Sequence, residues 1–399
     1  MKRKELIIVN TLIISMVLVF ALLTVRLSVN ESLGSLVSGI FSGKDKNLQM
    51  RARADSAKKC SNKPSLKLAK YTSDENVSRL REYQDVCSSY VTDSLMIFTT
   101  FAGDKPSADT GAAKMAAKLK LLHDAGIKPI VVAEPYAGDV SISFKDFAAG
   151  KYDASISYYF ERLKALGVSD EQMGTWVPFP EPNTPNWNNK DTEPRDFALC
   201  VNRYLHAMKA VFPTAKASVL LNATTYEPTD YAWDNGDYLD LTPYLQEIDK
   251  SLVTSVGIQG FPWVSNATQS RREIFRASEF LQPDLAIAAA RELHIRDIWF
   301  NTGSFAAKYT NDKSKRVTIS PNERKGILND ILDVAMTTRN YQQNAYRVSV
   351  NLFSEDKSSA TEATDWSYLQ DTDNKMVFKD FITRAQQNSV PVSLFDIKQ

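Results

Sequence analysis

Acidic and amide residues follow several of the short apolar runs in this sequence. Glu134 ends the run Lys128–Glu134, and Glu181 ends the run Thr175–Glu181. Two carboxyl groups can work together as general acid and base, or as acid and nucleophile. Amide side chains at matching positions can bind hydroxyl groups, and the candidates are Asn183, Asn222 and Asn301, with Asn351 in a later run. We interpret these residues as one candidate site.

Aromatic residues occur in the same segments that follow the runs. The candidates for substrate binding among them are Tyr136, Trp187, Trp263 and Trp366. Aromatic faces suit the apolar CH surfaces of sugar rings, while carboxyl and amide groups suit sugar hydroxyls. The combination therefore predicts carbohydrate binding. The alternative is that these are ordinary loop residues, since tryptophan and asparagine are common in long loops and a glutamate after a strand can cap a helix.

From Ser65 onward, eight apolar runs alternate with segments of helical period. Continuous apolar runs are typical of strands that are buried on both faces, and the helical segments would form an outer ring. This pattern predicts an α/β fold, a (β/α)8 TIM barrel, with its active site at the carboxyl ends of the strands. The expected strands are 66–71, 95–101, 128–134, 175–181, 217–222, 255–261, 297–301 and 346–353.

A doubly wound open sheet is the main alternative fold. Such a sheet usually carries a glycine-rich phosphate loop after its first strand, and neither GxGxxG nor GxxxxGK[ST] occurs here. The clearest helix start also fits the barrel, because Ser320 can cap a helix with Pro321 at its first position and Glu323 at its third. We expect one catalytic-type domain over residues 65–399.

The composition excludes several classes of protein. The chain has 399 residues, 43% of them hydrophobic, with 48 Lys and Arg against 47 Asp and Glu. Such a chain can bury a large core, and its charge balance gives no basis for nucleic-acid binding. His123, His206 and His294 all lie on or at the ends of expected helices. We therefore expect neither a histidine triad nor a metal, and no cofactor.

The N-terminus predicts a membrane anchor. Three basic residues, Lys2 to Lys4, precede a mostly apolar stretch, Leu6–Val25, of the length that crosses a bilayer as a helix. No small-x-small cleavage site ends the stretch. We expect an uncleaved signal anchor over residues 1–26 and an extracytoplasmic domain, because basic residues mark the cytoplasmic side. A cleaved signal peptide, giving a secreted protein, is the alternative.

Residues 27–64 are expected to form a stalk between the anchor and the domain. Its basic segment, residues 44–59, could contact anionic polymers or lipid headgroups, although a solvated spacer is the simpler interpretation. Disulfides persist in extracytoplasmic proteins, so Cys60 and Cys87 could form one. Cys200 lies on the apolar side of an expected helix, and we expect it to be a buried free thiol.

The segment TWVPFPEPNTPNW, Thr175–Trp187, resembles the fourth-strand motif of clan A glycoside hydrolases, and family 26, the β-mannanase family, most closely. The segment IWFNTGS, Ile298–Ser304, resembles the seventh strand of that family, and VGIQGFPW resembles its sixth. Asp365-Trp366-Ser367 resembles the end of its barrel. The resemblance implies a barrel that acts on a β-linked polysaccharide, either mannan-like or an exopolysaccharide, with Glu181 as the general acid/base.

The sequence departs from that family at the nucleophile position, where Asn301 stands. Retaining hydrolysis needs two carboxyl groups about 5–5.5 Å apart, and a neutral amide does not supply one. Three alternatives remain open. Glu134 could be the second carboxylate, a wider pair could support an inverting mechanism, or the barrel could bind polysaccharide without cleaving it. We therefore expect a membrane-anchored glycoside hydrolase-like protein, or alternatively a polysaccharide-binding protein in exopolysaccharide assembly or export.

Overall fold

The computed structural model describes one compact unit within Leu66–Gln399. The expected anchor, the stalk, Cys60 and Cys87 lie outside the described residues. No helix in the described part of the chain combines the length and the apolar composition that a membrane span needs. The residues described are 91–100, 103–137, 140–182, 193–223, 241–262, 276–304, 307–309, 316–341, 346–353, 356–357, 364–365, 368 and 371–395.

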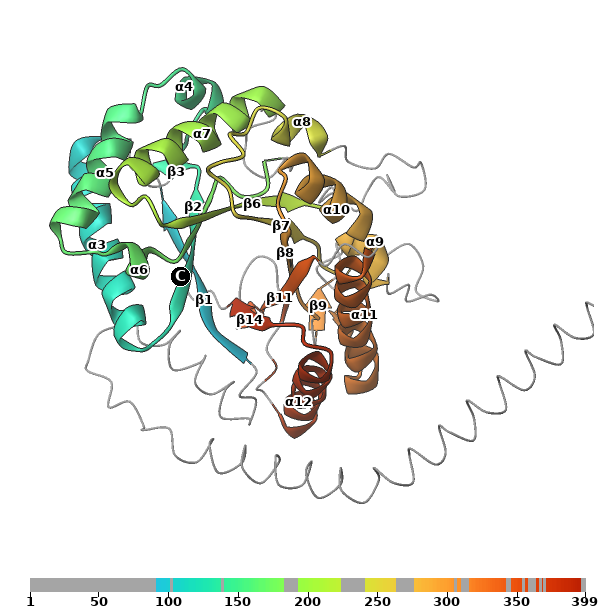
Figure 1. Ribbon diagram of the computed structural model, residues 1–399. Helices are drawn as coiled ribbons and strands as arrows, with labels where there is room; N and C mark the ends of the chain where they lie inside the picture. Colours follow the sequence, from blue (N-terminus) through green and yellow to red (C-terminus); the bar gives the residue numbers. More distant parts are fainter. Residues whose placement is uncertain are drawn as a thin grey trace, which may run out of the picture. The chain divides into compact units, whose positions relative to one another are not determined.

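Eight parallel strands form a closed barrel (Figure 1). The last strand pairs in parallel with both the first strand and the seventh, which closes the ring. This confirms the predicted (β/α)8 TIM barrel. The strands are β1 (Val91–Thr100), β2 (Lys128–Glu134), β5 (Thr175–Pro178), β6 (Lys216–Asn222), β7 (Ser255–Gln259), β8 (Asp297–Thr302), β11 (Arg347–Phe353) and β14 (Val392–Phe395).

The eight barrel strands differ from the eight predicted runs at both ends of the series. The expected first strand, residues 66–71, lies outside the described residues, and the ring closes without it. The eighth strand is instead β14, which the sequence analysis missed. Glu181 therefore follows the third barrel strand and Asn301 lies on the sixth, where the resemblance expected the fourth and the seventh. The strand numbering behind the family 26 resemblance is wrong.

Helices cover the outside of the barrel, with α3, α5 and α7 on one side and α10, α11 and α12 on the other (Figure 1). Helix α11 begins as predicted: the Ser320 hydroxyl accepts from the Glu323 amide at 3.3 Å, and the Glu323 carboxylate accepts from the Ser320 amide at 2.7 Å. The described helices are α3 (Lys105–Asp124), α4 (Phe144–Ala148), α5 (Asp153–Ala165), α6 (Asp170–Met173), α7 (Pro194–Val211), α8 (Thr242–Leu245), α9 (Ala277–Leu281), α10 (Pro283–Glu292), α11 (Pro321–Arg339) and α12 (Thr372–Gln387).

The segments that follow β8 and β11 form a small antiparallel sheet. In it β9 pairs with both β10 and β13, and β12 pairs with β13. Asp365 therefore belongs to this small sheet and not to the last barrel strand, which corrects the expected end of the barrel. The strands are β9 (Ala307–Tyr309), β10 (Arg316–Thr318), β12 (Asp356–Lys357) and β13 (Thr364–Asp365); a second hairpin, β3 (Tyr136–Ala137) with β4 (Val140–Ser141), follows β2.

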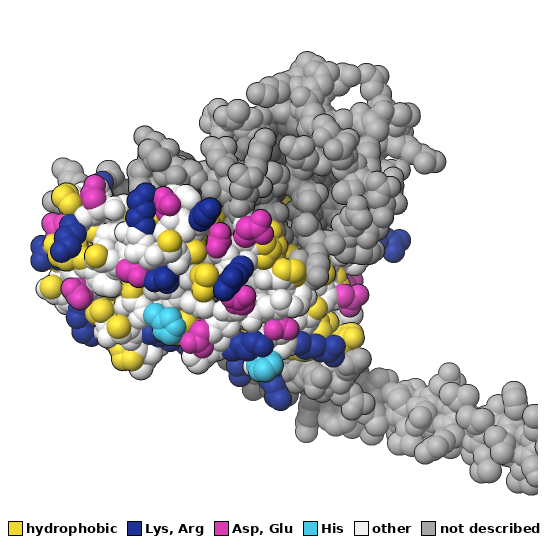
Figure 2. Space-filling view, turned by 90° about the horizontal axis from the view of Figure 1, so that it is seen from above, with side chains coloured by type: hydrophobic (Ala, Val, Ile, Leu, Met, Phe, Trp, Pro, Cys, Tyr) yellow, Lys and Arg dark blue, Asp and Glu magenta, His cyan; other side chains and the backbone are white. Residues whose placement is uncertain are grey.

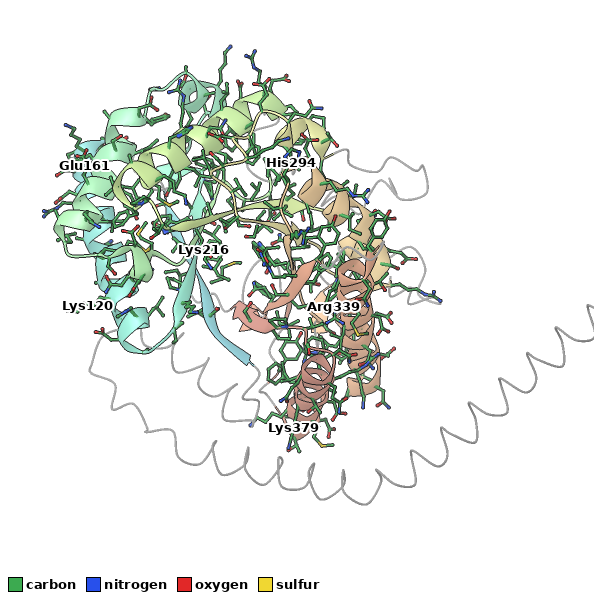
Figure 3. All side chains as sticks on the ribbon, in the orientation of Figure 1. Lys120, Glu161, Lys216, His294, Arg339 and Lys379 are labelled. Carbon is green, nitrogen blue, oxygen red and sulfur yellow. The ribbon has the colours of Figure 1, made fainter. Side chains whose placement is uncertain are left out.

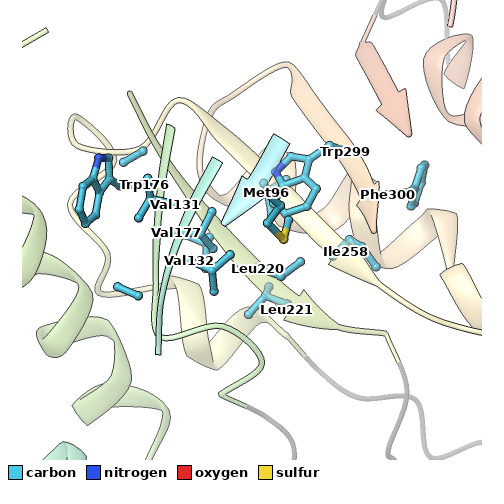
Figure 4. Close-up of a cluster of buried hydrophobic side chains, with 14 of the residues drawn as sticks. Met96, Val131, Val132, Trp176, Val177, Leu220, Leu221, Ile258, Trp299 and Phe300 are labelled. Atoms are coloured by element: carbon cyan, nitrogen blue, oxygen red, sulfur yellow. The ribbon is translucent and has the colours of Figure 1, made fainter. Parts of the chain in front are cut away.

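Two buried tryptophans show which strand positions face out and which face in (Figure 4). Trp176 on β5 points outward, since its ring lies 5.4 Å from the Phe160 ring on α5. Trp299 on β8 points inward, because its indole nitrogen reaches across β7 and donates to the Ser218 hydroxyl on β6 at 2.8 Å. Gly257 lies under this indole, and a Cβ there would be 2.4 Å from the ring. At the level of Trp299 the interior is thus filled by side chains.

The surface carries both signs of charge in close mixture. Figure 2 shows lysine and arginine side chains interspersed with aspartate and glutamate on the face that it draws. Oppositely charged side chains also pair on the described surface, as Arg203 does with Asp153 at 2.6 Å and Lys325 with Asp380 at 2.6 Å. This face therefore offers no broad patch of one sign, in agreement with the balanced charge of the whole chain.

Candidate functional site

Glu181 lies in an unusual backbone conformation directly after β5. Phe179 has a φ of 51° and Glu181 a φ of 56°, which is the left-handed region that non-glycine residues rarely adopt. Each of them precedes a proline, Pro180 and Pro182, whose rings further restrict the chain. Such strained residues persist only where the surroundings hold them, and they concentrate at functional sites.

Both neighbouring strands hold this segment in place. The Phe179 amide donates to the carbonyl of Ala133 on β2 at 2.8 Å, and the Glu181 amide donates to the carbonyl of Leu220 on β6 at 2.8 Å. The Phe179 ring is fully buried, 4.8 Å from the ring of Phe147 on α4. The segment is therefore anchored on three sides, and the Glu181 side chain is left half-buried at the carboxyl end of the barrel.

A chain of hydrogen bonds runs from Glu181 around the inside of the barrel. Gln259 on β7 donates its amide N–H to the Glu181 Oε1 atom. Asn301 on β8 donates to the Gln259 Oε1 atom at 2.5 Å, and Asn351 on β11 donates to the Asn301 Oδ1 atom at 2.6 Å. Ser393 on β14 donates its hydroxyl to the Asn351 Oδ1 atom at 2.9 Å. We call these five residues the polar row.

Strand register explains why the polar row forms. Gln259 pairs laterally with Asn301, Asn301 with Asn351, and Asn351 with Ser393. Residues at paired positions of parallel strands face the same side, so all four point into the barrel, as Trp299 does two residues before Asn301. Asn222 on β6, the lateral partner of Gln259, completes the arrangement by donating to the Glu181 Oε2 atom at 3.4 Å.

The polar row has a direction. Each amide accepts with its oxygen from the residue behind it and donates with its nitrogen to the residue in front, and the series ends on the Glu181 carboxylate. Hydrogen bonds in such a chain polarise one another and strengthen together. Glu181 thus has both oxygens held by N–H donors, one from Gln259 and one from Asn222. Its carboxylate is fixed in one orientation.

The structure brings part of the predicted site together. Glu181, Asn222 and Asn301 meet in or beside the polar row. Glu134 ends β2, the strand next to β5, and is half-buried, so the two acids lie at the carboxyl ends of neighbouring strands. Tyr136 follows in β3. The remaining predicted residues, Asn183, Trp187, Trp263 and Trp366, lie outside the described residues.

Sequence reasoning missed Gln259 and Ser393. Gln259 ends an apolar run, SVGIQ, and a polar side chain there is the signal that could have identified it. It stands two residues after Gly257, so both share the inward face of β7. Ser393 escaped notice because its strand was not predicted. Both residues have the same property as Asn301, a buried polar side chain at an inward position of a barrel strand.

A buried arginine holds the segment that follows Asn301. Arg324 on α11 is fully buried, and its Nε and Nη2 atoms donate to the Ser304 carbonyl at 2.9 and 2.6 Å. The Tyr368 hydroxyl accepts from the Ser304 amide at 2.9 Å, and the guanidinium lies 3.9 Å from the centre of the Tyr368 ring. Burial raises the pKa of Tyr368, so this hydroxyl stays neutral. These contacts hold the segment that follows β8 in place.

The other residues that sequence analysis considered for chemistry lie elsewhere. His123 and His206 are exposed on α3 and α7, and His294 is exposed after α10, as predicted. Cys200 is a buried free thiol on α7, also as predicted, and burial raises its pKa well above the usual value. Among the described residues, no three histidine, cysteine, aspartate or glutamate side chains come together as a candidate metal site.

Comparisons with known proteins give structural likeness without sequence likeness. No model of a known protein family matches the chain, and no curated protein matches it in sequence. Among solved structures, a β-glucosidase from Thermotoga maritima in complex with deoxynojirimycin is 10% identical, with a TM-score of 0.48 over 79% of this chain and 88% of that one. The structure of two fungal β-1,4-galactanases gives 12% identity and a TM-score of 0.48, covering 75% of this chain and 90% of that one. At these values the likeness carries no conclusion about chemistry.

Proposed function

We propose that the chain is a glycoside hydrolase-like protein that acts on a β-linked polysaccharide, mannan-like or an exopolysaccharide, through Glu181. One observation carries the proposal: a half-buried carboxylate in a strained backbone at the carboxyl end of a barrel strand, with both oxygens oriented by amide donors. Active sites of such barrels lie at this end, and a fixed carboxylate is the group that acid–base and nucleophilic catalysis of glycosyl transfer require.

An aromatic ring at the carboxyl end of the barrel also suits a sugar. Phe261, which follows β7, is half-buried, and its ring meets the ring of Phe353 at the end of β11 edge to face, with centroids 5.8 Å apart. Aromatic faces bind the apolar side of sugar rings. The combination of a carboxylate and the half-buried Phe261 ring at one end of the barrel supports carbohydrate as the ligand class.

Glu134 is the proposed partner of Glu181. Asn301 does not fill the nucleophile role, because an amide is neutral and this one is 1% exposed and bonded on both sides within the polar row. Glu134 ends the adjacent strand and is half-buried. In our proposal, Glu181 acts as the general acid/base and Glu134 as the nucleophile, or as the base that activates water if the pair is wide.

A second candidate function is polysaccharide binding without cleavage, in exopolysaccharide assembly or export. The observation that favours it is the polar row itself, in which Glu181 is followed by neutral side chains only. A site of this kind can orient hydroxyl groups without supplying a second charge.

Hydrolysis assays of the full chain test both candidates. The purified protein is incubated with β-mannan, β-glucan, β-galactan and the exopolysaccharide of the organism that produces it. New reducing ends are measured alongside binding. We expect cleavage that falls at least about a hundredfold in E181Q and in E134Q. The matched control is E161Q, which alters an exposed glutamate on α5, labelled in Figure 3, and should retain full activity.

Each result decides between the candidates. Binding without product release from the wild type would replace the hydrolase by the binding protein. Equal cleavage by E181Q and the wild type would refute the role of Glu181. Neither binding nor cleavage of any glycan would refute the proposed ligand class.

We also propose that residues 1–26 anchor the protein in a membrane with the barrel outside the cytoplasm, on the basis of the sequence pattern alone. Membranes from the organism that produces the protein are extracted with alkaline carbonate, and the intact chain should stay in the pellet. Recovery of the full-length chain in the soluble fraction would refute the anchor, and recovery of a shortened chain in the medium would identify a cleaved signal.

A further inference from the structure

The amino end of the barrel, opposite Glu181, holds a cavity of about 820 Å³. Its lining comes from the first residues of the barrel strands, including Lys128 on β2, Lys216 on β6 and Arg347 on β11, together with Arg339 at the end of α11. Trp299 also lines it. This indole crosses the barrel interior above Gly257, so it covers part of the inner wall of the cavity.

The lysines occupy inward positions of their strands. Lys216 pairs with Thr175, which pairs with Ile130, and Lys128 lies two residues before Ile130. Lys216 also lies two residues before Ser218, whose hydroxyl receives the indole N–H of Trp299 inside the barrel. Because side chains alternate along a strand, Lys128, Thr175 and Lys216 all face the interior side. Both lysines are exposed first residues of their strands, so their ammonium groups are accessible at the amino end of the barrel.

The cavity has an excess of positive charge. Four cations line it against one carboxylate, Asp297. Arg347 forms a two-pronged ion pair with Asp297 on the adjacent strand, which neutralises that acid. Within the described residues, Arg339 donates to backbone carbonyls, those of Asn388 and Ser389, and forms no ion pair with a carboxylate. Among the described residues, neither Lys128 nor Lys216 makes a hydrogen bond or an ion pair through its ammonium group. In the part of the chain that the structure describes, three positive charges of this cavity therefore have no carboxylate partner.

Hydroxyl groups stand between these charges. Thr175 lies on β5, between the two lysine strands, and Ser255, Ser349 and Ser393 line the wall from β7, β11 and β14. Proteins bind phosphate and carboxylate groups through cationic side chains and hydroxyl donors, because such groups offer negative charge and several acceptor oxygens.

We propose that this cavity binds an oxyanion, a phosphate or carboxylate group, held by Lys128, Lys216 and Arg339. The ligand could be a free small molecule or the headgroup of an anionic lipid, since both present the same oxygens. This inference does not depend on the proposed glycosidase activity, because the cavity lies at the other end of the barrel from Glu181.

Titration of the full chain with inorganic phosphate tests the proposal. We expect saturable binding by calorimetry, and a dissociation constant about three- to tenfold higher in the double variant K128Q/K216Q. The single variant K216Q should show a smaller increase. The matched control is K120Q/K379Q, which removes two exposed lysines of α3 and α12 that do not line the cavity (Figure 3) and should bind as the wild type does.

Vesicles distinguish the two sources of the ligand. Wild-type protein that sediments more completely with phosphatidylglycerol vesicles than with phosphatidylcholine vesicles, while K128Q/K216Q shows no such preference, would support the proposal with a lipid headgroup as the ligand. Saturable phosphate binding without a preference for phosphatidylglycerol vesicles would support a free oxyanion. The proposal is wrong if the wild type neither binds phosphate nor prefers phosphatidylglycerol vesicles, or if K128Q/K216Q matches the wild type in both measurements.

Discussion

Replacing Asn301 by aspartate tests the direction of the polar row. The Asn301 nitrogen donates to the Gln259 oxygen at 2.5 Å, and its oxygen accepts from Asn351 at 2.6 Å. In N301D the second contact survives, but the first becomes a contact between two acceptors. Rotating the Gln259 amide does not help, because its oxygen would then face the Glu181 carboxylate instead. The row is left one N–H donor short in either arrangement.

The expected cost of N301D follows from burial. Asn301 is 1% exposed, so water does not compensate the lost donor. A buried acceptor without a partner costs about 1–3 kcal/mol, and removing one partner from a buried charged contact costs about 3–5 kcal/mol. We expect the free energy of unfolding to fall by about 2–5 kcal/mol at pH 7. The protonated form of the introduced carboxyl can donate to Gln259, so the loss should shrink at lower pH.

The sign of this pH dependence is fixed. The folded state penalises the ionised form, so the pKa of the introduced carboxyl lies above its unfolded value of about 3.9. The penalty is complete above the folded pKa and vanishes below the unfolded one. Urea unfolding at pH 7 and pH 5, followed by the fluorescence of the buried Trp176 and Trp299, measures it.

Asn202 provides the matched control for N301D. Its nitrogen also donates one hydrogen bond, to the Glu247 carbonyl at 2.8 Å, and its oxygen also accepts one, from the Asp249 amide at 2.8 Å, but at a half-exposed position. N202D should cost less than about 1 kcal/mol, since water can replace the lost contact. Unchanged stability of N301D at pH 7, or a loss that grows as the pH falls, would refute a directed polar row.

Three further predictions concern the barrel and its helices. G257A should lower the free energy of unfolding by about 1–3 kcal/mol and alter the fluorescence of Trp299, because the new Cβ would lie 2.4 Å from the indole. The control G326A, where nothing lies within 4 Å of the new Cβ, should raise the free energy of unfolding by about 0.5–1 kcal/mol. Unchanged stability of G257A would contradict the packing of the barrel interior. Cys200 should react with a thiol reagent only at the rate of unfolding, measured as a function of urea, since it is buried and its pKa is raised; fast labelling of the native protein would be inconsistent with this. D371A should lower the free energy of unfolding by about 1 kcal/mol at pH 7, because the α12 cap is lost. Hydrogen bonds from the start of the helix lower the pKa of Asp371, so the stability difference between D371A and the wild type should be complete above about pH 4, near the pKa of the unfolded carboxyl, and should vanish at lower pH. Acid-unfolding curves of the two proteins measure this difference.

The sequence predicted most of the barrel because its strands and helices carry strong local patterns. The run Lys128–Glu134 is β2 with the same bounds, and the cap at Ser320 begins α11. The failure lay in closing the ring. β14 has four residues and follows α12 after a short turn, so its pattern is too brief to stand out, and only its pairing with β1 and β11 identifies it as a barrel strand.

The candidate site was predicted in part for a related reason. Glu181, Asn222 and Asn301 could be found because each ends an apolar run, and strand ends of a barrel meet at one edge. The role of Gln259 could not be found, because it depends on lateral register: only the pairing of β7 with β6 and β8 shows that Gln259 lies between Asn222 and Asn301. The left-handed backbone at Glu181 also has no sequence signature, since glycine is absent there.

Ser393 contributes to both the polar row and the cavity at the amino end of the barrel. Its hydroxyl donates to Asn351 in the polar row, and the same residue lines the cavity that holds Lys128, Lys216 and Arg339. An anion that drew this hydroxyl proton toward itself would take the last donor from the series that terminates on Glu181. Occupancy at one end and acidity at the other would then be thermodynamically linked, and by reciprocity a substrate at Glu181 would alter the affinity of the distant anion by the same factor.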